Sequence, residues 1–355
     1  MISPPDIFYY EVWLMKYNEE VDVLTMEKIN DLLTELPQYV KNYISNLAAG
    51  SKSRRTILNY LYDIRGFLTF MADAQDIDVM DLSADTLGQL NNFDFDDYFG
   101  SFRTGKSEGK ARKLAALRSF YKFLKSYGFI AHNPLAEYSI ELKQKKDPRR
   151  DLQFMNTEEV NQVMAGVTTG SSLASEHQKK CNRENQYRDT ALFTLMLNTG
   201  IRLSECVGID LSDILWEEHK LVIHRKGGID DIVFLNENAE SALRNYIRYE
   251  RPEDADDPAL FLSNQRRRIT PRSVQRIVKK YTESVVPDKN IHVHSLRKTF
   301  GDNLYQATHD IKLTQQALNH SDISVTAAHY ITDNAENKKT AVEIIQNVYR
   351  EDSKT

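Results

Sequence analysis

Apolar positions recur at helical spacing over most of the chain. The segment from Lys110 to Tyr127 has apolar residues three or four positions apart, with basic residues between them. The same spacing runs from Ser53 to Ala72, where the predicted buried stripe consists of Ile57, Leu58, Leu61, Ile64, Phe67, Leu68 and Met71. Both segments are therefore predicted to be amphipathic helices, and the one from Lys110 to Tyr127 has a basic outer face.

Shorter elements are predicted in the second half. Asn156, followed by acidic residues, is typical of a capped helix start, and an apolar helix from about Arg188 to Asn198 is expected to end at Gly200. Two apolar runs flank Lys226, which predicts a β-hairpin with this lysine at its tip. The strands are expected at Leu221 to Arg225 and Asp231 to Leu235, and further helices at Thr270 to Glu283, about Ser295 to Gln306, and Glu336 to Tyr349.

These elements predict a mainly α protein with a small β-hairpin or sheet in its second half. A length of 355 residues favours two domains, because single hydrophobic cores usually stop growing below this size. The charged segment KQKKDPRRD at 143–151 contains Pro148 and has no apolar residue, so it is predicted to be a linker. The expected division is a helical domain at 1–142, the linker, and a second domain at 152–355.

Composition places the chain among ordinary folded proteins. It is 41% hydrophobic and 27% charged, with a net charge of −5. No apolar run approaches the ~18 residues that a membrane span needs, so we expect no membrane contact and a cytoplasmic location. The two cysteines, Cys181 and Cys206, lack metal-ligand or redox spacing, which favours a reducing compartment.

The charges are unevenly distributed. Residues 1–50 have eight acids against three bases, and residues 71–99 have eight Asp with no Lys or Arg. In contrast, residues 103–150 have thirteen bases against four acids, and residues 263–300 have ten against two. Two basic patches on an acidic chain indicate directed contact with a polyanion, although solvated helix faces are the alternative explanation.

Residues 100–107 match the pattern G-x-x-x-x-G-K-[ST] of a nucleotide-binding loop, from Gly100 to Ser107. That loop requires a buried strand before it and a helix after it whose N-terminus faces the phosphates. The preceding residues, 94–99, are too acidic for a central parallel strand. We therefore interpret the match as accidental and assign Lys106 to the basic patch, with ATP binding kept as a rival hypothesis.

Five segments of the second half carry residues suited to phosphodiester chemistry without a metal. His294 and Arg297, three positions apart on a predicted helix, should share one face. A metal site built from His292, His294, His309 and His320 is the alternative, but no carboxylate or cysteine spacing supports it. In chain order the candidates are Arg202 with Glu205, Lys226, His294 with Arg297, His320, and Tyr330.

The order and spacing of these residues resemble the tyrosine recombinase (phage integrase) family over nearly the whole chain. TGIRLSE, HSLRKTF and the LNHSDISVT stretch leading to Tyr330 are similar to signature segments of that family. In the first half, AALRSFYKFL followed by Asn133-Pro134 resembles the end of the family's helical core-binding domain. Xer-type chromosome-dimer resolvases and integrases of mobile elements are similar. The resemblance implies a C-shaped clamp with its two domains on opposite faces of double-stranded DNA.

The resemblance also implies a role for each candidate residue. Tyr330 would attack a DNA phosphate and form a 3′-phosphotyrosyl link, and Lys226 would protonate the leaving 5′-oxygen. Glu205 would orient Arg202. The non-bridging oxygens and the developing charge would be held by Arg202, Arg297, His294 and His320. No metal, ATP or other cofactor is implied.

The chain departs from the common family pattern at two positions. Asn319 stands where glycine usually precedes the second histidine, and the interval from His320 to Tyr330 is ten residues. His329 is a rival phosphate partner, but as the neighbour of Tyr330 it should point elsewhere. The helix from Glu336 resembles a segment that docks into an adjacent protomer, which implies a monomer in solution that forms a tetramer on two duplexes.

The expected activity is site-specific recombination through a Holliday junction, in a bacterial, nucleoid-associated protein. A type IB topoisomerase-like enzyme and a non-catalytic DNA-binding protein are the alternatives. The acidic N-terminal arm slightly favours a Xer-like role over mobile-element integration. DNA contacts are expected along two basic helices, at Lys110, Arg112, Lys113, Arg118, Lys122, Arg272, Arg276 and Lys279.

Overall fold

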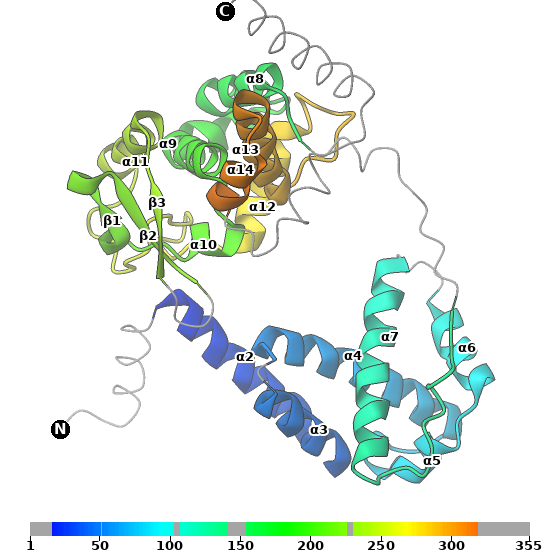
Figure 1. Ribbon diagram of the computed structural model, residues 1–355. Helices are drawn as coiled ribbons and strands as arrows, with labels where there is room; N and C mark the ends of the chain where they lie inside the picture. Colours follow the sequence, from blue (N-terminus) through cyan, green and yellow to red (C-terminus); the bar gives the residue numbers. More distant parts are fainter. Residues whose placement is uncertain (1–15, 51, 103–106, 141–153, 226–229, 319–355) are drawn as a thin grey trace, which may run out of the picture. The chain divides into compact units, whose positions relative to one another are not determined.

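The protein is described here by a computed structural model that covers residues 16–50, 52–102, 107–140, 154–225 and 230–318. The chain divides into two units, Met1–Lys146 (unit 1) and Asp147–Thr355 (unit 2) (Figure 1). The linker predicted at 143–151 and the helix predicted at Glu336 to Tyr349 lie outside the described residues and stay predictions. None of the described helices is long and apolar enough to span a membrane.

The regular secondary structure in the described residues of unit 1 is all helical. The helix α4 confirms the first predicted stripe: Ser53 caps its N-terminus through the N–H of Thr56, and all seven predicted stripe residues are buried. The helices are α2 (Tyr17–Thr34), α3 (Gln38–Ala49), α4 (Arg54–Gln75), a 3₁₀ turn (Val79–Asp81), α5 (Ala84–Gly88), α6 (Asn92–Ser101) and α7 (Ser107–Ser126).

The core of unit 1 is built around aromatic side chains of α4, α6 and α7. Phe67 packs edge-on against Tyr121 and stacks on Phe95, with ring centroids 6.2 and 6.0 Å away, respectively. The buried hydroxyl of Tyr121 donates to the carbonyl of Leu87 at 3.2 Å. The helix α6 occupies the position where a nucleotide-binding loop would need a strand, so the motif at 100–107 lacks the structural context of such a loop.

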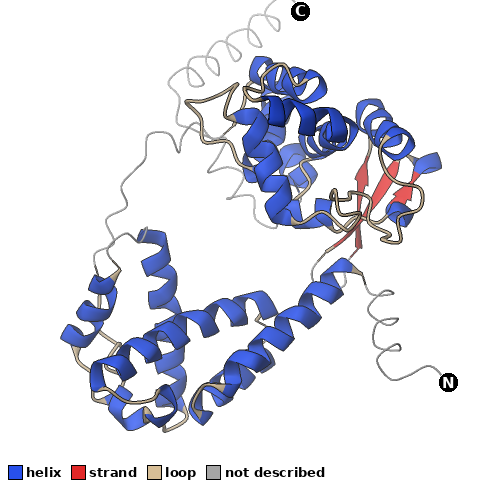
Figure 2. Ribbon diagram, turned by 180° about the vertical axis from the view of Figure 1, so that it is seen from behind, coloured by secondary structure: helices blue, strands red, loops and turns tan. Residues whose placement is uncertain are grey.

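Unit 2 is a helical domain with one small sheet (Figure 2). Its central helix, α9, packs against α8, α11 and α13. The elements are α8 (Thr157–Thr169), α9 (Glu176–Thr199), α10 (Leu203–Val207), β1 (Ile214–Leu215), β2 (Lys220–His224), β3 (Asp230–Phe234), α11 (Glu237–Tyr249), α12 (Pro271–Thr282), α13 (Val293–Thr308) and α14 (Ile311–Leu318), with 3₁₀ turns at Leu211–Asp213 and Trp216–Glu218.

The predicted hairpin is confirmed as β2 and β3, which pair antiparallel with Leu221 opposite Val233 and His224 opposite Asp230. Its predicted tip at Lys226 lies outside the described residues. A third strand, β1, was not predicted; it pairs with β2 on the other side and completes the order β1-β2-β3. Two residues are too few to show the alternation that identifies a strand in sequence.

The prediction for the central helix was wrong at its start. α9 begins at Glu176, twelve residues before the expected Arg188, and its N-terminus is capped by the hydroxyl of Ser175, which accepts the N–H of Gln178. The helix bends at Asn185, whose φ of −135° and ψ of 22° are not helical. Beyond the bend, the Glu250 carboxylate accepts the N–H groups of Tyr187 and Arg188.

Other predicted helix boundaries agree with the structure. Asn156 caps α8 through the N–H of Glu159, and Thr270 caps α12 ahead of Pro271 in its first turn. α13 begins at Val293, two residues before the predicted start. Both cysteines, Cys181 and Cys206, are free thiols. Burial raises the pKa of Cys206 to about 12.

Candidate active site

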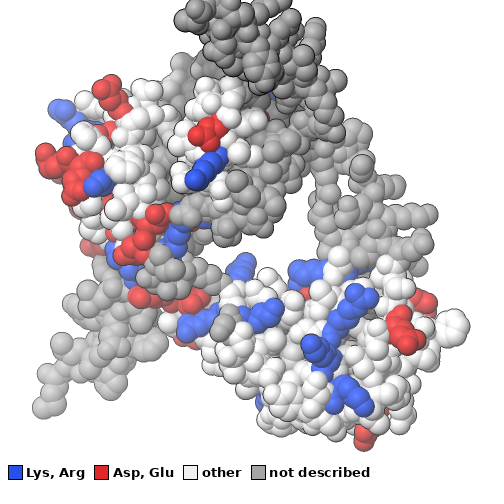
Figure 3. Space-filling view, in the orientation of Figure 1, with Lys and Arg blue, Asp and Glu red and all other residues white. Residues whose placement is uncertain are grey.

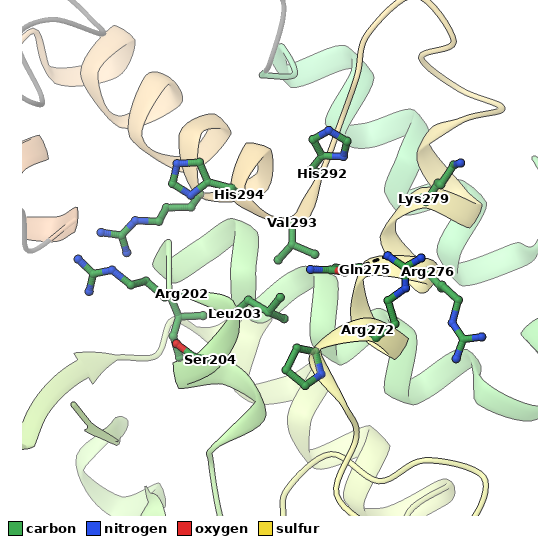
Figure 4. Close-up of a pocket in the computed structure, with 13 residues that line it drawn as sticks. Arg202, Leu203, Ser204, Arg272, Gln275, Arg276, Lys279, His292, Val293 and His294 are labelled. Atoms are coloured by element: carbon green, nitrogen blue, oxygen red, sulfur yellow. Dashed lines mark hydrogen bonds between the residues drawn. The ribbon is translucent and has the colours of Figure 1, made fainter. Parts of the chain in front are cut away.

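A pocket of about 750 Å³ opens in unit 2 between the turn that joins α9 to α10 and the helices α12 and α13. Three of the candidate residues line it: Arg202, His294 and Arg297. Figure 4 shows Arg202 and His294 on one side of this pocket and the labelled side chains of α12 on the other. The pocket therefore brings together residues separated by about 95 positions in the sequence, from 202 to 297.

The end of α9 places Arg202. Gly200 ends this helix in the left-handed conformation, with a φ of 62°, and a Cβ added there would lie 2.4 Å from Cδ1 of Phe300. Arg202 then precedes the short helix α10, and Glu205 accepts two hydrogen bonds from Arg202. Oε2 of Glu205 accepts the N–H of Arg202, and Oε1 accepts from its guanidinium, both at 2.8 Å. Glu205 itself is not among the residues that line the pocket.

Arg297 is fixed by backbone carbonyl groups. Its residue is 6% exposed, and its guanidinium donates to the carbonyl oxygen of Gly200 at 2.5 Å and to that of Leu318. His294, one turn earlier on α13, is exposed and lines the same pocket, as the three-residue spacing predicts. Arg297 thus ties α13 to the ends of α9 and α14, and its orientation depends on all three helices.

The helix α12 contributes further cations to the pocket. Arg272, Arg276 and Lys279 lie along its pocket-lining side, where Arg272 donates to the side-chain oxygen of Gln275 at 3.5 Å. No Asp or Glu is among the described residues that line the pocket. A concave site with this many cations is suited to a phosphate backbone. The described part of the chain has no group of three or more His, Cys, Asp or Glu side chains that could hold a metal ion.

The opposite side of α12 is anchored by Asp189, which sequence reasoning missed. This carboxylate is 0% exposed and accepts from the Lys280 ammonium at 3.0 Å and the Tyr281 hydroxyl at 2.8 Å. Arg188 supplies two more donors to it. Burial and the neighbouring carboxylate raise the pKa of Tyr281 above its ordinary value, so its hydroxyl remains the donor. The sequence signal for this anchor was the charged pair Arg188-Asp189, which stands at the start of the apolar part of α9.

The basic residues predicted on α7 lie in unit 1 and are partly engaged in bonds within it. Figure 3 shows Lys and Arg side chains gathered along this helix. Arg112 and Lys113 both pair with Asp63, whose side chain is 2% exposed. The remaining bonds go to backbone carbonyls: Lys110 to Phe99 at 2.7 Å, Arg118 to Tyr138 at 2.9 Å, and Lys125 to Ala131.

Three candidate residues lie outside the described residues: Lys226, His320 and Tyr330. The structure therefore brings together Arg202, His294 and Arg297, with Glu205 behind the first of them. For the remaining three, the assignment rests on sequence spacing and on resemblance alone.

Comparison with known proteins identifies the family. The sequence profile described as "Phage integrase family" matches residues 153–337, and the profile "Phage integrase, N-terminal SAM-like domain" matches residues 40–128. The chain belongs to the phage integrase family of tyrosine recombinases. Family membership confirms the resemblance found in the sequence, and it makes the protein a site-specific DNA recombinase.

Curated relatives match most of the chain. The tyrosine recombinase XerC of Caldanaerobacter subterraneus subsp. tengcongensis is 30% identical over 342 residues, which cover 91% of this chain and 89% of the relative. XerC of Anoxybacillus flavithermus is 29% identical over 317 residues, covering 86% and 94%.

Solved structures share the fold. The XerH recombinase bound to a palindromic difH substrate has a TM-score of 0.60 at 16% identity, covering 82% of this chain and 80% of that one. A lambda integrase dimer bound to a COC′ core site has a TM-score of 0.58 at 15% identity, covering 82% and 94%. The expected mainly α fold with a small sheet is thereby confirmed.

Proposed function

We propose that this recombinase cleaves one DNA strand at a time by attack of Tyr330 on a backbone phosphate. The new bond joins the tyrosine oxygen to phosphorus, and the bond to the 5′-oxygen breaks as Lys226 supplies its proton. Arg202 and Arg297 hold the non-bridging oxygens, and His294 and His320 add donors to the developing charge. Neither a divalent ion nor ATP is required, because the cations neutralise the phosphate and the covalent link conserves the bond energy.

One observation carries this proposal: Arg202, His294 and Arg297 line a single cationic pocket. Two arginines that approach one site from different elements match the two non-bridging oxygens of a phosphate, since a guanidinium fork binds oxygens in pairs and stays charged. The α12 cations line the same pocket and add to its positive charge, which suits a phosphate backbone.

We further propose that residues 1–142 form the core-binding domain, that 143–151 is the linker, and that 152–355 is the catalytic domain. The two domains would close around one duplex as a C-shaped clamp. Four protomers, monomeric when free, would then assemble on two duplexes through the segment from Glu336. A lambda integrase tetramer on a Holliday junction, with a TM-score of 0.59 at 15% identity over 82% of this chain and 76% of that one, has the same fold.

The biological task is proposed to be resolution of chromosome dimers or movement of a mobile element, in the cytoplasm and at the nucleoid. XerC relatives and an integrase of the Tn1549 transposon are both among the similar proteins. The Tn1549 integrase, in complex with circular intermediate DNA, has a TM-score of 0.60 at 17% identity, covering 86% of this chain and 98% of that one.

The test is trapping on nicked suicide DNA that carries candidate sites from the protein's own genomic neighbourhood. We expect an adduct on Tyr330, located by mass spectrometry, that forms in EDTA and without ATP. Tyr330→Phe should bind the same DNA and form no adduct, so cleavage by this variant would refute the assignment. Exchange between two sites separates a recombinase from a type IB topoisomerase, which relaxes DNA without synapsis.

A further inference from the structure

Arg225 stands at the end of strand β2 and reaches toward α10. Its Nη2 atom lies 2.6 Å from Oδ2 of Asp231 on the neighbouring strand β3. Its Nε atom lies 3.5 Å from Oε1 of Glu205, the oxygen that accepts from the Arg202 guanidinium. A single carboxylate oxygen therefore lies between two guanidinium groups, one on the pocket wall and one on the hairpin.

The Nε group of Arg225 is buried and makes no hydrogen bond to any described residue. Leaving a buried donor unsatisfied is costly, so this group has a strong tendency to take any acceptor within reach. The acceptor at hand is Glu205, and a movement of about half an ångström would bring the pair to ordinary hydrogen-bond distance. At 3.5 Å, the contact between Arg225 Nε and Glu205 Oε1 is longer than an ordinary hydrogen bond and has room to shorten.

The Glu205 side chain is only 9% exposed, so its charge needs a partner at all times. In the structure that partner is Arg202, whose side chain is 41% exposed toward the pocket. If Arg202 turned its guanidinium to a phosphate, the Glu205 carboxylate would lose its closest cation. Without a second cation nearby, the carboxylate would hold Arg202 back from the substrate.

We propose that Arg225 is a positioning residue that shares the Glu205 carboxylate and so allows Arg202 to bind the scissile phosphate. Arg225 completes its bond to Glu205 as Arg202 turns to the DNA, and the carboxylate stays paired. This inference rests on the proposed function, because it requires Arg202 to hold a phosphate oxygen. It adds a link from the β2–β3 hairpin, which continues directly into Lys226, to the arginine of the α9–α10 turn.

The hairpin does not depend on Arg225 for its own integrity. His224, the preceding residue, lies between two carboxylates, with Nδ1 2.6 Å from Asp230 and Nε2 3.0 Å from Asp213. The strand ladder also continues to the pair His224 and Asp230. Removing the Arg225 side chain therefore leaves the strands paired, and its effect on cleavage can be measured in a folded protein.

The rival explanation is that Arg225 serves only to tie β2 to β3 through Asp231. Asp231→Asn removes this tie and leaves Arg225 beside Glu205, whereas Arg225→Gln removes both contacts. If the Glu205 contact matters, Arg225→Gln lowers the single-turnover cleavage rate by about tenfold, the value of a charge-assisted hydrogen bond. Asp231→Asn should stay within about twofold of the wild type. Equal losses in the two variants would overturn the proposal.

A double-mutant cycle with Glu205→Gln tests whether Arg225 acts through this carboxylate. In the Glu205→Gln background, adding Arg225→Gln should change the rate by no more than about twofold, because the contact is already gone. A tenfold loss in both backgrounds would mean that Arg225 acts independently of Glu205. The matched control is Arg248→Gln, an exposed arginine of α11 in the same unit, which should leave the rate unchanged.

The measurement uses the full chain at saturating concentration on nicked suicide DNA, with DNA affinity and thermal unfolding recorded for every variant. Affinity and melting temperature should be the same for Arg225→Gln and the wild type, while the cleavage rate falls. If the wild type forms no adduct on Tyr330, the proposed function fails. If the wild type forms the adduct and Arg225→Gln cleaves at the same rate, only the role of Arg225 fails.

Discussion

The guanidinium of Arg297 donates a hydrogen bond to the carbonyl oxygen of Gly200 at 2.5 Å, across 97 positions of the sequence. Gly200 ends α9 two residues before Arg202, so Arg202 and Arg297 are connected through one short stretch of backbone. A displacement of α13 would move Arg297 and, through the Gly200 carbonyl, the turn that places Arg202. We therefore expect substitutions at one of these positions to affect the geometry of the others.

Arg297→Lys should lower the single-turnover cleavage rate by about 10- to 100-fold, because a lysine cannot hold the Gly200 carbonyl and a phosphate oxygen together. DNA affinity should change little, since many other cations contribute to it. Suicide-substrate cleavage and a binding titration measure the two effects. Arg268→Lys is the control: Arg268 also bonds backbone carbonyls, those of Val207 and Ile209, but does not line the pocket. A similar loss of cleavage in both variants would contradict the prediction.

Gly200→Ala should destabilise unit 2 by at least about 2 kcal/mol. A side chain is strained at the φ of 62°, and its Cβ would lie 2.4 Å from the ring of Phe300. Gly128→Ala separates the two causes, because Gly128 has a φ of 75° but no atom within 4 Å of an added Cβ. It should cost only about 1 kcal/mol in unit 1. Urea unfolding followed separately for each unit measures both, and equal costs would show that the Phe300 contact relaxes freely.

Asp189→Asn should destabilise the protein by about 3 kcal/mol, because it leaves Arg188 and Lys280 without the buried carboxylate that pairs with them. Asp254→Asn is the matched control, since Asp254 pairs with Arg266 on the surface, where both side chains are more than half exposed. This change should cost less than about 0.5 kcal/mol. Chemical denaturation measures both variants, and the prediction fails if Asp189→Asn is as mild as the control.

Glu250→Gln should become more stabilising, relative to the wild type, as pH rises from about 4 to about 7. Burial raises the pKa of Glu250, although the N–H groups of Tyr187 and Arg188 oppose the shift. A raised folded-state pKa favours the folded protein while the carboxyl is protonated, and this contribution is lost as pH rises through that pKa. Glutamine keeps an acceptor for the same N–H groups and carries no charge to bury. Melting temperatures at both pH values test this, and a difference that is constant with pH would contradict it.

Much of the fold could be predicted because its signals are local. The apolar stripe of α4, the cap of α8 at Asn156 and the cap of α12 at Thr270 each depend on residues within one or a few helical turns. The hairpin was visible as two apolar runs around a glycine pair. The sequence signal for each of these elements therefore lies within or next to the element itself.

The start of α9 was missed: the cap formed by Ser175 and Gln178 is a local signal, but no apolar stripe follows it and distant groups stabilise this part of the helix. Residues 176–187 are mostly polar and show no apolar stripe. The side chain of Asn182 donates to the carbonyl of Val167 and to the hydroxyl of Tyr281. At the bend, the Glu250 carboxylate accepts the N–H of Tyr187. A sequence window of one helix contains none of these partners.

The candidate site shows the same division. The spacing of His294 and Arg297 predicted a shared face, and both line the pocket together with Arg202. The supporting contacts were not foreseen, since Arg225 meets Glu205 of α10 from just beyond the end of β2 and Asp189 meets Lys280 across 91 positions. For Lys226, His320 and Tyr330 the assignment remains a prediction.

If α7 contacts DNA, as the sequence predicts, the pairing of Asp63 with Arg112 and Lys113 changes the expected salt dependence of that binding. A cation that already has a carboxylate neighbour gains less from a phosphate, and its contact displaces fewer condensed counterions from the duplex. Lys122 is exposed and makes no bond to another described residue, so it acts with its full charge. The slope of log affinity against log salt concentration would therefore be shallower than the number of bases on α7 suggests. On the prediction that α7 contacts DNA, Asp63 would lower the electrostatic contribution of Arg112 and Lys113 and fix their orientation, which would favour one backbone geometry over general attraction to DNA.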